Sequence, residues 1–109
     1  METDVLTHVA DMIVFDDDDV VAVEVGDLEL ALYHVDGEVF ATDQMCTHGL
    51  ASLADGLMLD GLIECPLHSG TFDVKTGKAI GAPCTEDLKT YKVSVKGTSI
   101  FVALPANKV

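Results

Sequence analysis

Two short segments, each with one cysteine and one histidine, restrict the fold of this chain more than any other feature. Thiolates and imidazoles so close together are typical of metal ligands, and both segments contain a glycine that permits a tight turn. A chain that uses both must bring two loops from distant parts of the sequence together. The segments are Cys46-Thr47-His48-Gly49 and Cys65-Pro66-Leu67-His68-Ser69-Gly70.

The arrangement of these donors favours one metal group over another. Two loops that each supply a thiolate and an imidazole can present two sulfurs to one iron and two nitrogens to a second, as in a [2Fe–2S] cluster with His₂ in place of Cys₂. A zinc site is the alternative, but its two cysteines usually share one knuckle and its histidines another. We therefore predict one [2Fe–2S] cluster with four ligands, Cys46, His48, Cys65 and His68.

The rest of the chain predicts short strands separated by turns. Asp36-Gly37 and Asp60-Gly61 each lie between apolar runs, which is a strong hairpin signal. Helix is scarce, with one turn expected at 51–54. Strands are expected at Val20–Val25, Leu28–His34, Val39–Thr42, Met58–Glu64 around its turn, Thr71–Val74, Tyr91–Lys96 and Ser99–Leu104.

This pattern predicts an all-β fold in one domain, residues 1–109. Many short strands at regular spacing indicate an antiparallel sandwich or small barrel. Between about 43 and 83 the loops lengthen and both Cys/His segments appear. We interpret this range as a loop-rich subdomain that holds the metal and is inserted into the strand framework.

Composition excludes several classes of function. The net charge is −13, from 19 acidic and 6 basic residues, so nucleic acid and anionic membranes are not expected partners. The longest apolar run, Ile100–Leu104, is too short for a membrane span or a signal peptide, and we expect a cytoplasmic protein. The run Asp16–Asp19 is expected in a solvated turn, with a calcium loop as the less favoured alternative.

The remaining polar and aromatic residues have ordinary structural interpretations. An odd number of cysteines argues against a disulfide framework, and we interpret Cys84 as a small buried apolar residue. His8 and His34 are expected to be structural or surface residues, and Tyr33 and Tyr91 core or edge aromatics.

The two metal-binding segments resemble the cluster-binding loops of Rieske proteins. Three further segments resemble the ferredoxins of bacterial aromatic-ring-hydroxylating dioxygenase systems, especially the naphthalene-dioxygenase type. These segments are Leu30-Ala31-Leu32-Tyr33, Asp36-Gly37-Glu38-Val39-Phe40-Ala41-Thr42 and Lys89-Thr90-Tyr91. The resemblance implies a Rieske fold, with Cys46 and Cys65 on the buried iron and His48 and His68 on the outer iron.

The resemblance also implies a carrier rather than an enzyme. Its partners would be a flavin-dependent NAD(P)H reductase and a terminal Rieske oxygenase, both bound transiently by a monomer. Leu50, Leu67 and Pro83 are expected to form an apolar rim around the cluster. The alternative is a Rieske-like small subunit of a larger enzyme such as a nitrite reductase.

Two differences from high-potential respiratory Rieske proteins predict a low reduction potential. Those proteins carry an extra disulfide-bonded cysteine in each loop, where this chain has Leu50 (or a near neighbour) and Leu67. They also donate serine and tyrosine hydroxyls to cluster sulfurs, where this chain has Gly70 and Phe72. Such hydrogen bonds stabilise the reduced cluster, so their absence lowers the potential.

Overall fold

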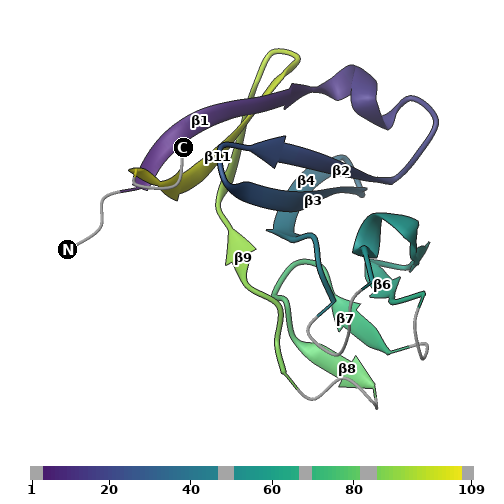
Figure 1. Cartoon of the computed structure of the whole chain (residues 1–109). Helices are drawn as coiled ribbons and strands as arrows, with labels where there is room; N and C mark the ends of the chain where they lie inside the picture. Colours follow the sequence, from purple (N-terminus) through teal and green to yellow (C-terminus); the bar gives the residue numbers. More distant parts are fainter. Residues whose placement is uncertain (1–3, 47–50, 67–69, 82–85, 107–109) are drawn as a thin grey trace.

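The computed structural model describes residues 4–46, 51–66, 70–81 and 86–106, and the regular structure within these is almost entirely antiparallel strand. The described residues form three sheets (Figure 1). The outer sheet has the order β1-β11-β10, with β1 at Asp4–Asp11, β10 at Val93–Lys96 and β11 at Ser99–Pro105.

The central sheet has the order β2-β3-β4-β9, and the small sheet has the order β5-β6-β7-β8. The described residues also form two short 3₁₀ helices, η1 (Met12–Phe15) and η2 (Leu53–Asp55). The central strands are β2 (Val20–Val25), β3 (Leu28–Val35), β4 (Glu38–Asp43) and β9 (Thr90–Tyr91). The small-sheet strands are β5 (Leu57–Leu59), β6 (Leu62–Glu64), β7 (Thr71–Asp73) and β8 (Ala79–Gly81).

The Asp-Gly pairs form the hairpin turns that the sequence predicts. Asp36 and Gly37 have φ of 51° and 80°, and Asp60 and Gly61 have φ of 52° and 80°. Two successive positive φ values are the signature of a type I′ turn, whose twist matches that of the flanking strands. The first turn joins β3 to β4 and the second joins β5 to β6.

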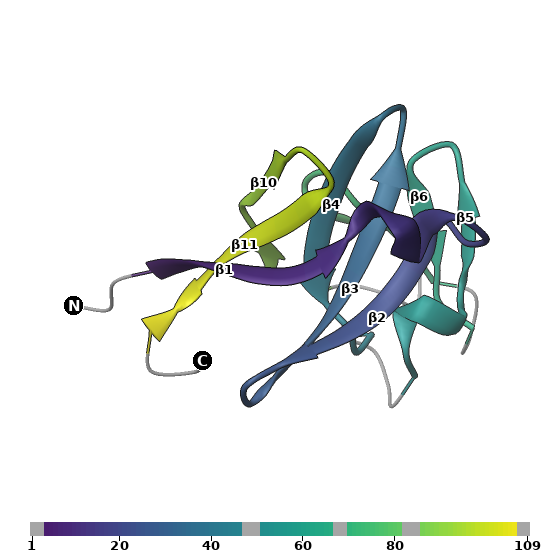
Figure 2. The ribbon, with the colours of Figure 1, turned by 90° about the horizontal axis from the view of Figure 1, so that it is seen from above.

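Strand β3 is buried on both faces and separates two cores. Leu30 and Leu32 face a framework core between the central and outer sheets. Ala31 and Tyr33 point the opposite way, into a second core that the small sheet covers. The alternation follows from the two-residue period of a strand, and an apolar run without polar breaks is typical of a strand buried on both sides. Figure 2 shows β3 between β11 and β6.

The structure adds elements that the sequence analysis did not identify, namely β1, η1 and β8. The expected strand Tyr91–Lys96 is wrong in detail, because the chain passes from the central to the outer sheet at Lys92. Tyr91 in β9 pairs with Ala41, whereas β10 pairs with β11. A sandwich permits this change of sheet within a few residues where a strand bends at a corner.

Two further findings concern expectations made from composition. Asp16–Asp19 follow η1 and all four are exposed, in agreement with the solvated turn. Among the described residues, no helix is long and apolar enough to cross a membrane.

Candidate metal centre

Cys46 begins a loop whose two stems are hydrogen-bonded to each other. Its N–H donates to the carbonyl of Ala51 (2.9 Å), and Met45 forms a β-bridge with Ser52. The Leu53 N–H also donates to the carbonyl of Gln44 (2.8 Å). The loop 47–50 is therefore closed at its base by backbone bonds.

Cys65 begins a second loop with an equivalent closure. Its N–H donates to the carbonyl of Gly70 at 2.7 Å, directly beyond the β6–β7 pair of Glu64 and Thr71. In both loops the cysteine N–H thus bonds to the carbonyl five residues further along the chain, Ala51 or Gly70. The residues that flank the two segments are therefore bonded alike, and the segments are also alike in their donor residues.

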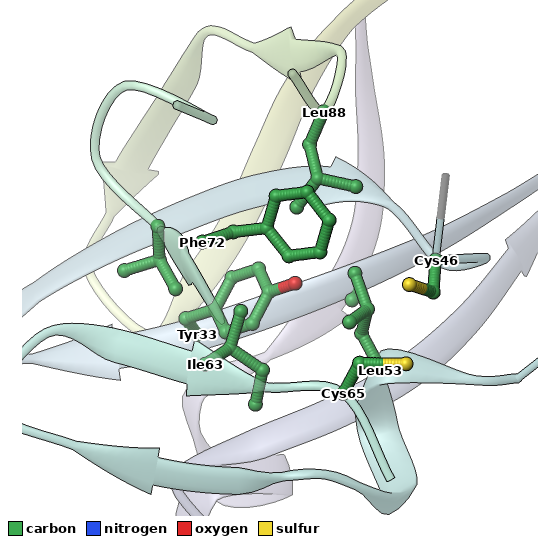
Figure 3. Packing of buried hydrophobic residues seen from close by; sticks show 9 residues of the cluster. Tyr33, Cys46, Leu53, Ile63, Cys65, Phe72 and Leu88 are labelled. Atoms are coloured by element: carbon green, nitrogen blue, oxygen red, sulfur yellow. The ribbon is translucent and has the colours of Figure 1, made fainter. Parts of the chain in front are cut away.

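The structure brings both cysteines into one apolar cluster. Cys46 is 5% exposed and Cys65 is 1% exposed, and the two belong to the core cluster that also contains Leu53, Ile63 and Phe72. In Figure 3 their sulfur atoms lie on the same side of this cluster. Both are thiols and are not joined to each other by a disulfide.

This donor pair fits an iron–sulfur group. A buried thiolate is costly unless a metal or another cation compensates its charge, and metal binding requires the thiolate form. Two sequence-distant thiols in one water-poor cluster supply the sulfur half of the predicted donor set. The alternative, that both cysteines are simply small apolar core residues, does not account for two Cys/His segments whose flanking residues are bonded alike.

The nitrogen half of the predicted set lies outside the described residues. His48 and His68 fall in 47–50 and 67–69, and the rim residues Leu50, Leu67 and Pro83 and the odd Cys84 are also outside. Within the described ranges, no group of three or more His, Cys, Asp or Glu side chains is placed to hold a metal ion. Of the four predicted ligands, the structure thus places the two cysteines.

The sequence analysis did not identify a hydrogen-bond network at the start of the first loop. The Tyr33 hydroxyl bonds to Thr42 Oγ1 at 2.8 Å, and Thr42 Oγ1 donates to the carbonyl of Asp43 at 2.8 Å. Both side chains are fully buried, and burial raises the pKa of Tyr33 above its ordinary value although the bond to Thr42 opposes this. Tyr33 therefore stays a neutral phenol and anchors the strand end that leads to Cys46.

A second polar cluster joins the start of η2 to Gln44, two residues before Cys46. Gln44 Nε2 donates to Ser52 Oγ at 2.9 Å, and the same oxygen accepts from the N–H of Ala54 at 3.2 Å. A serine three residues before an acidic residue, here Asp55, is a signal for a helix start that the sequence contains. This signal would have placed the short helix one or two residues later than the turn expected at 51–54.

Phe72, His34, His8 and Tyr91 have the roles that the sequence predicts. Phe72 is fully buried in the cysteine cluster and offers no hydroxyl group there. His34 stacks on Phe15, and His8 is exposed beside Asp11. Tyr91 is half-buried and donates to Asp43 Oδ1 at 2.5 Å.

Comparison with known proteins identifies the family. The model of the Rieske [2Fe-2S] domain matches residues 5–92. The ferredoxin component of a naphthalene 1,2-dioxygenase system from Pseudomonas aeruginosa is 51% identical over 86 residues, which is 79% of this chain and 83% of that protein.

Solved structures agree with this family. The Sphingomonas yanoikuyae B1 ferredoxin superposes with a TM-score of 0.86 and 40% identity, over 93% of this chain and all of that one. The ferredoxin in a complex of reduced oxygenase and oxidized ferredoxin of carbazole 1,9a-dioxygenase gives 0.82 and 37%, over 90% and 92%.

The chain belongs to the Rieske [2Fe–2S] domain family. Its cofactor is accordingly a Rieske-type [2Fe–2S] cluster. Within the family, its relatives are the ferredoxin components of aromatic-ring dioxygenase systems, and the resemblance noted in the sequence is confirmed. Such components are electron carriers, not catalysts.

Proposed function

We propose that this chain carries single electrons from a flavin-containing NAD(P)H reductase to the terminal Rieske oxygenase of an aromatic-ring-hydroxylating dioxygenase system. The observation that supports it most is that the cysteines of both Cys/His segments meet in one cluster, in a chain 51% identical over 86 residues to a dioxygenase ferredoxin. The proposal assigns the ligands to Cys46, His48, Cys65 and His68. The histidine assignment rests on the sequence motif.

When bound, a Rieske cluster accepts and releases one electron with little change in structure. The protein's own residues set the conditions for this. Cys46 and Cys65 supply negative charge inside an apolar cluster, and Leu53, Ile63 and Phe72 exclude water around them. The backbone bonds from Cys46 to Ala51 and from Cys65 to Gly70 restrict the positions of both cysteines.

The acidic surface supports transient association. A carrier must bind and leave two partners in turn, and small charged contacts suit such encounters better than large apolar interfaces. We therefore propose a monomer that is steered to basic patches on its partners and acts in the cytoplasm. A net charge of −13 makes these encounters strongly dependent on ionic strength.

Reconstitution tests the proposal. The purified protein is expected to contain inorganic sulfide and iron in equal amounts, and to show a rhombic EPR signal only after reduction. Added to the reductase and oxygenase of a naphthalene 1,2-dioxygenase system, it should restore NAD(P)H-driven turnover. A colourless zinc protein, or one that purifies only in a permanent complex with a large catalytic subunit, would refute it.

Phe72 offers a separate test of the predicted low potential. We expect a midpoint near the lower end of the Rieske range, roughly −150 mV. Phe72→Tyr introduces a hydroxyl in the cysteine cluster, and a hydrogen bond to sulfur worth about 1 kcal/mol raises a one-electron potential by about 40 mV. Redox titration measures both proteins, with Phe40→Tyr as the matched control at a partly buried site that packs against the same cluster. A strongly positive wild-type midpoint would contradict the prediction.

A further inference from the structure

Positive and negative charges are strongly segregated along this chain. Residues 1–74 contain 17 of the 19 carboxylates and no lysine or arginine, whereas all six basic residues, every one a lysine, follow. The acidic surface accounts for the proposed steering toward basic partners. The lysines are left without a role in that proposal.

Three of the lysines line one hollow whose lining includes none of the four proposed ligands. The hollow has a volume of about 930 Å³ and lies where β4 and β9 meet the outer sheet. Lys75, Lys89 and Lys92 line it together with two carboxylates, Asp4 and Glu38. Its charged lining therefore has an excess of positive charge, in a molecule whose carboxylates outnumber its lysines threefold.

Two of these lysines are held over aromatic rings. Lys75 Nζ lies 5.7 Å from the centroid of Phe40, and Lys89 Nζ lies 5.4 Å from that of Tyr91. A cation–π contact restricts a flexible side chain before any ligand arrives. Less conformational entropy is then lost when a carboxylate binds, so these ammonium groups are prepared for an anion.

The backbone beside the hollow has room for another extended chain. In the part of the chain that the structure describes, β9 pairs with β4 only at Ala41 and Thr42, and no strand pairs with Glu38–Phe40 on that side. Along an antiparallel hairpin, hydrogen-bonded residue pairs alternate with pairs that are not hydrogen-bonded. The two-residue turn makes Val35 and Glu38 a hydrogen-bonded pair, so the next pair, His34 and Val39, is not hydrogen-bonded. The N–H and C=O of Val39 consequently point away from β3, toward the hollow that this residue lines.

We propose that this hollow binds an extended acidic segment of a partner protein. The lysines would pair with its carboxylates, Phe40 and Tyr91 would contact its apolar parts, and the edge of β4 would bond its backbone. A peptide uses all three features, whereas a small inorganic anion uses only the lysines. The site contains none of the four proposed cluster ligands, so it gives a second contact that is separate from electron transfer.

Nuclear magnetic resonance detects such binding directly. The intact holoprotein is labelled with ¹⁵N and titrated with a hexaglutamate peptide at low salt. We expect chemical-shift changes at amides around Phe40, Lys75 and Lys89–Val93, which disappear at high salt. The double substitution Lys89→Gln/Lys92→Gln is expected to weaken binding roughly fivefold to tenfold, since each exposed ion pair contributes a modest amount.

Lys96→Gln is the matched control. Lys96 also lies over a ring, that of Phe101 at 5.6 Å, but it does not line the hollow, so binding should not change. An unchanged visible spectrum shows that each variant is folded and carries its cluster. The proposal is overturned if the peptide moves no amide near the hollow, if Lys96→Gln weakens binding as much as the double variant, or if inorganic phosphate reproduces the same shifts at equal charge.

Discussion

The two cores on either face of β3 are built differently. The framework core is made mainly of aliphatic residues from strands of six to eight residues, such as β3 and β11, and contains Leu30, Ile100 and Leu104. The core under the small sheet contains both cysteines, Tyr33 and Phe72, and the strands that cover it are three residues long.

We infer from this difference that hydrophobic burial stabilises the framework, whereas the cofactor stabilises the small sheet. Long strands with a continuous apolar face can hold themselves together by hydrophobic burial. Three-residue strands form few ladder bonds, and β6 and β7 each bury only one side chain fully, so we expect the stability of the small sheet to need a further contribution. Because metal binding and folding are coupled, the small sheet is expected to depend on the cluster and the framework is not.

Removing a cysteine ligand should separate the two cores most clearly. Cys46→Ser and Cys65→Ser are each expected to lose the visible absorbance of the cluster and nearly all amide protection in β5–β8. Amides of β3 and β11 should stay protected, because local opening need not spread to the whole molecule. Hydrogen exchange followed by mass spectrometry measures both regions in one experiment.

Cys84→Ser is the control for this prediction, since Cys84 is not among the predicted ligands. It should keep both the spectrum and the protection of β5–β8. If the small sheet stays protected in Cys65→Ser, its stability does not come from the cluster, and the contrast between the cores is wrong.

Two glycines with similar backbone conformations differ in their surroundings. Gly77 lies against the backbone of Leu88, whereas Gly37 lies in the open turn between β3 and β4. Gly77 and Gly37 have φ of 77° and 80°, so alanine meets similar backbone strain at each. A Cβ on Gly77 would lie 2.3 Å from the carbonyl oxygen of Leu88, whereas one on Gly37 meets nothing within 4 Å. Gly77→Ala should therefore lower the free energy of unfolding by roughly 3 kcal/mol, and Gly37→Ala by about 1 kcal/mol.

Urea denaturation of the holoprotein gives both values. The steric cost at Gly77 is expected because Gly77 and Leu88 are also joined by a backbone hydrogen bond of 2.7 Å, so neither can move away easily. If Gly77→Ala and Gly37→Ala lower the free energy of unfolding equally, the contact between Gly77 and Leu88 is not rigid.

Each core also contains or contacts one tyrosine, Tyr33 under the small sheet and Tyr91 beside the framework core. Their effect on the pH dependence of stability is the smallest that we predict. Burial is the largest cause that raises the pKa of Tyr33 and of Tyr91 above the ordinary 10.0, and for Tyr91 the bond to Asp43 adds to it. Unfolded tyrosines lose their proton near pH 10 while the folded ones keep it. The stabilisation is therefore complete below about pH 10 and declines as the pH rises toward the folded values.

The measurement is the free energy of unfolding between pH 9 and 11 for wild type, Tyr33→Phe and Tyr91→Phe. A fully buried phenol changes the slope by at most about 1.4 kcal/mol per pH unit. Tyr33→Phe should remove more of the alkaline decline than Tyr91→Phe, because solvent screens the half-buried Tyr91. If Tyr91→Phe removes more of the alkaline decline than Tyr33→Phe, the prediction is wrong, and the ionisation of the tyrosine beside the framework core affects stability more.

Local features of this protein were predictable from its sequence. Asp36-Gly37 and Asp60-Gly61 form the predicted turns with nearly identical φ values, because the conformation of a two-residue turn depends on the residues within it. The predicted pairing of donors also rests on short spacing within each loop. The amino-acid sequence alone is therefore sufficient to recognise a cluster-binding protein of this family.

Long-range contacts were decided only by the tertiary structure. The pairing of β1 with β11 joins the two ends of the described chain, and five of the eight residues of β1 are exposed, so β1 shows no clear apolar alternation. The change of sheet at Lys92, the contact of Gly77 with Leu88 and the gathering of three lysines around one hollow depend on residues far apart in sequence. Such contacts form only when whole sheets pack against each other. The hydrophobic effect favours burial whatever the sequence separation of the residues, so a local sequence pattern does not predict which residues will meet.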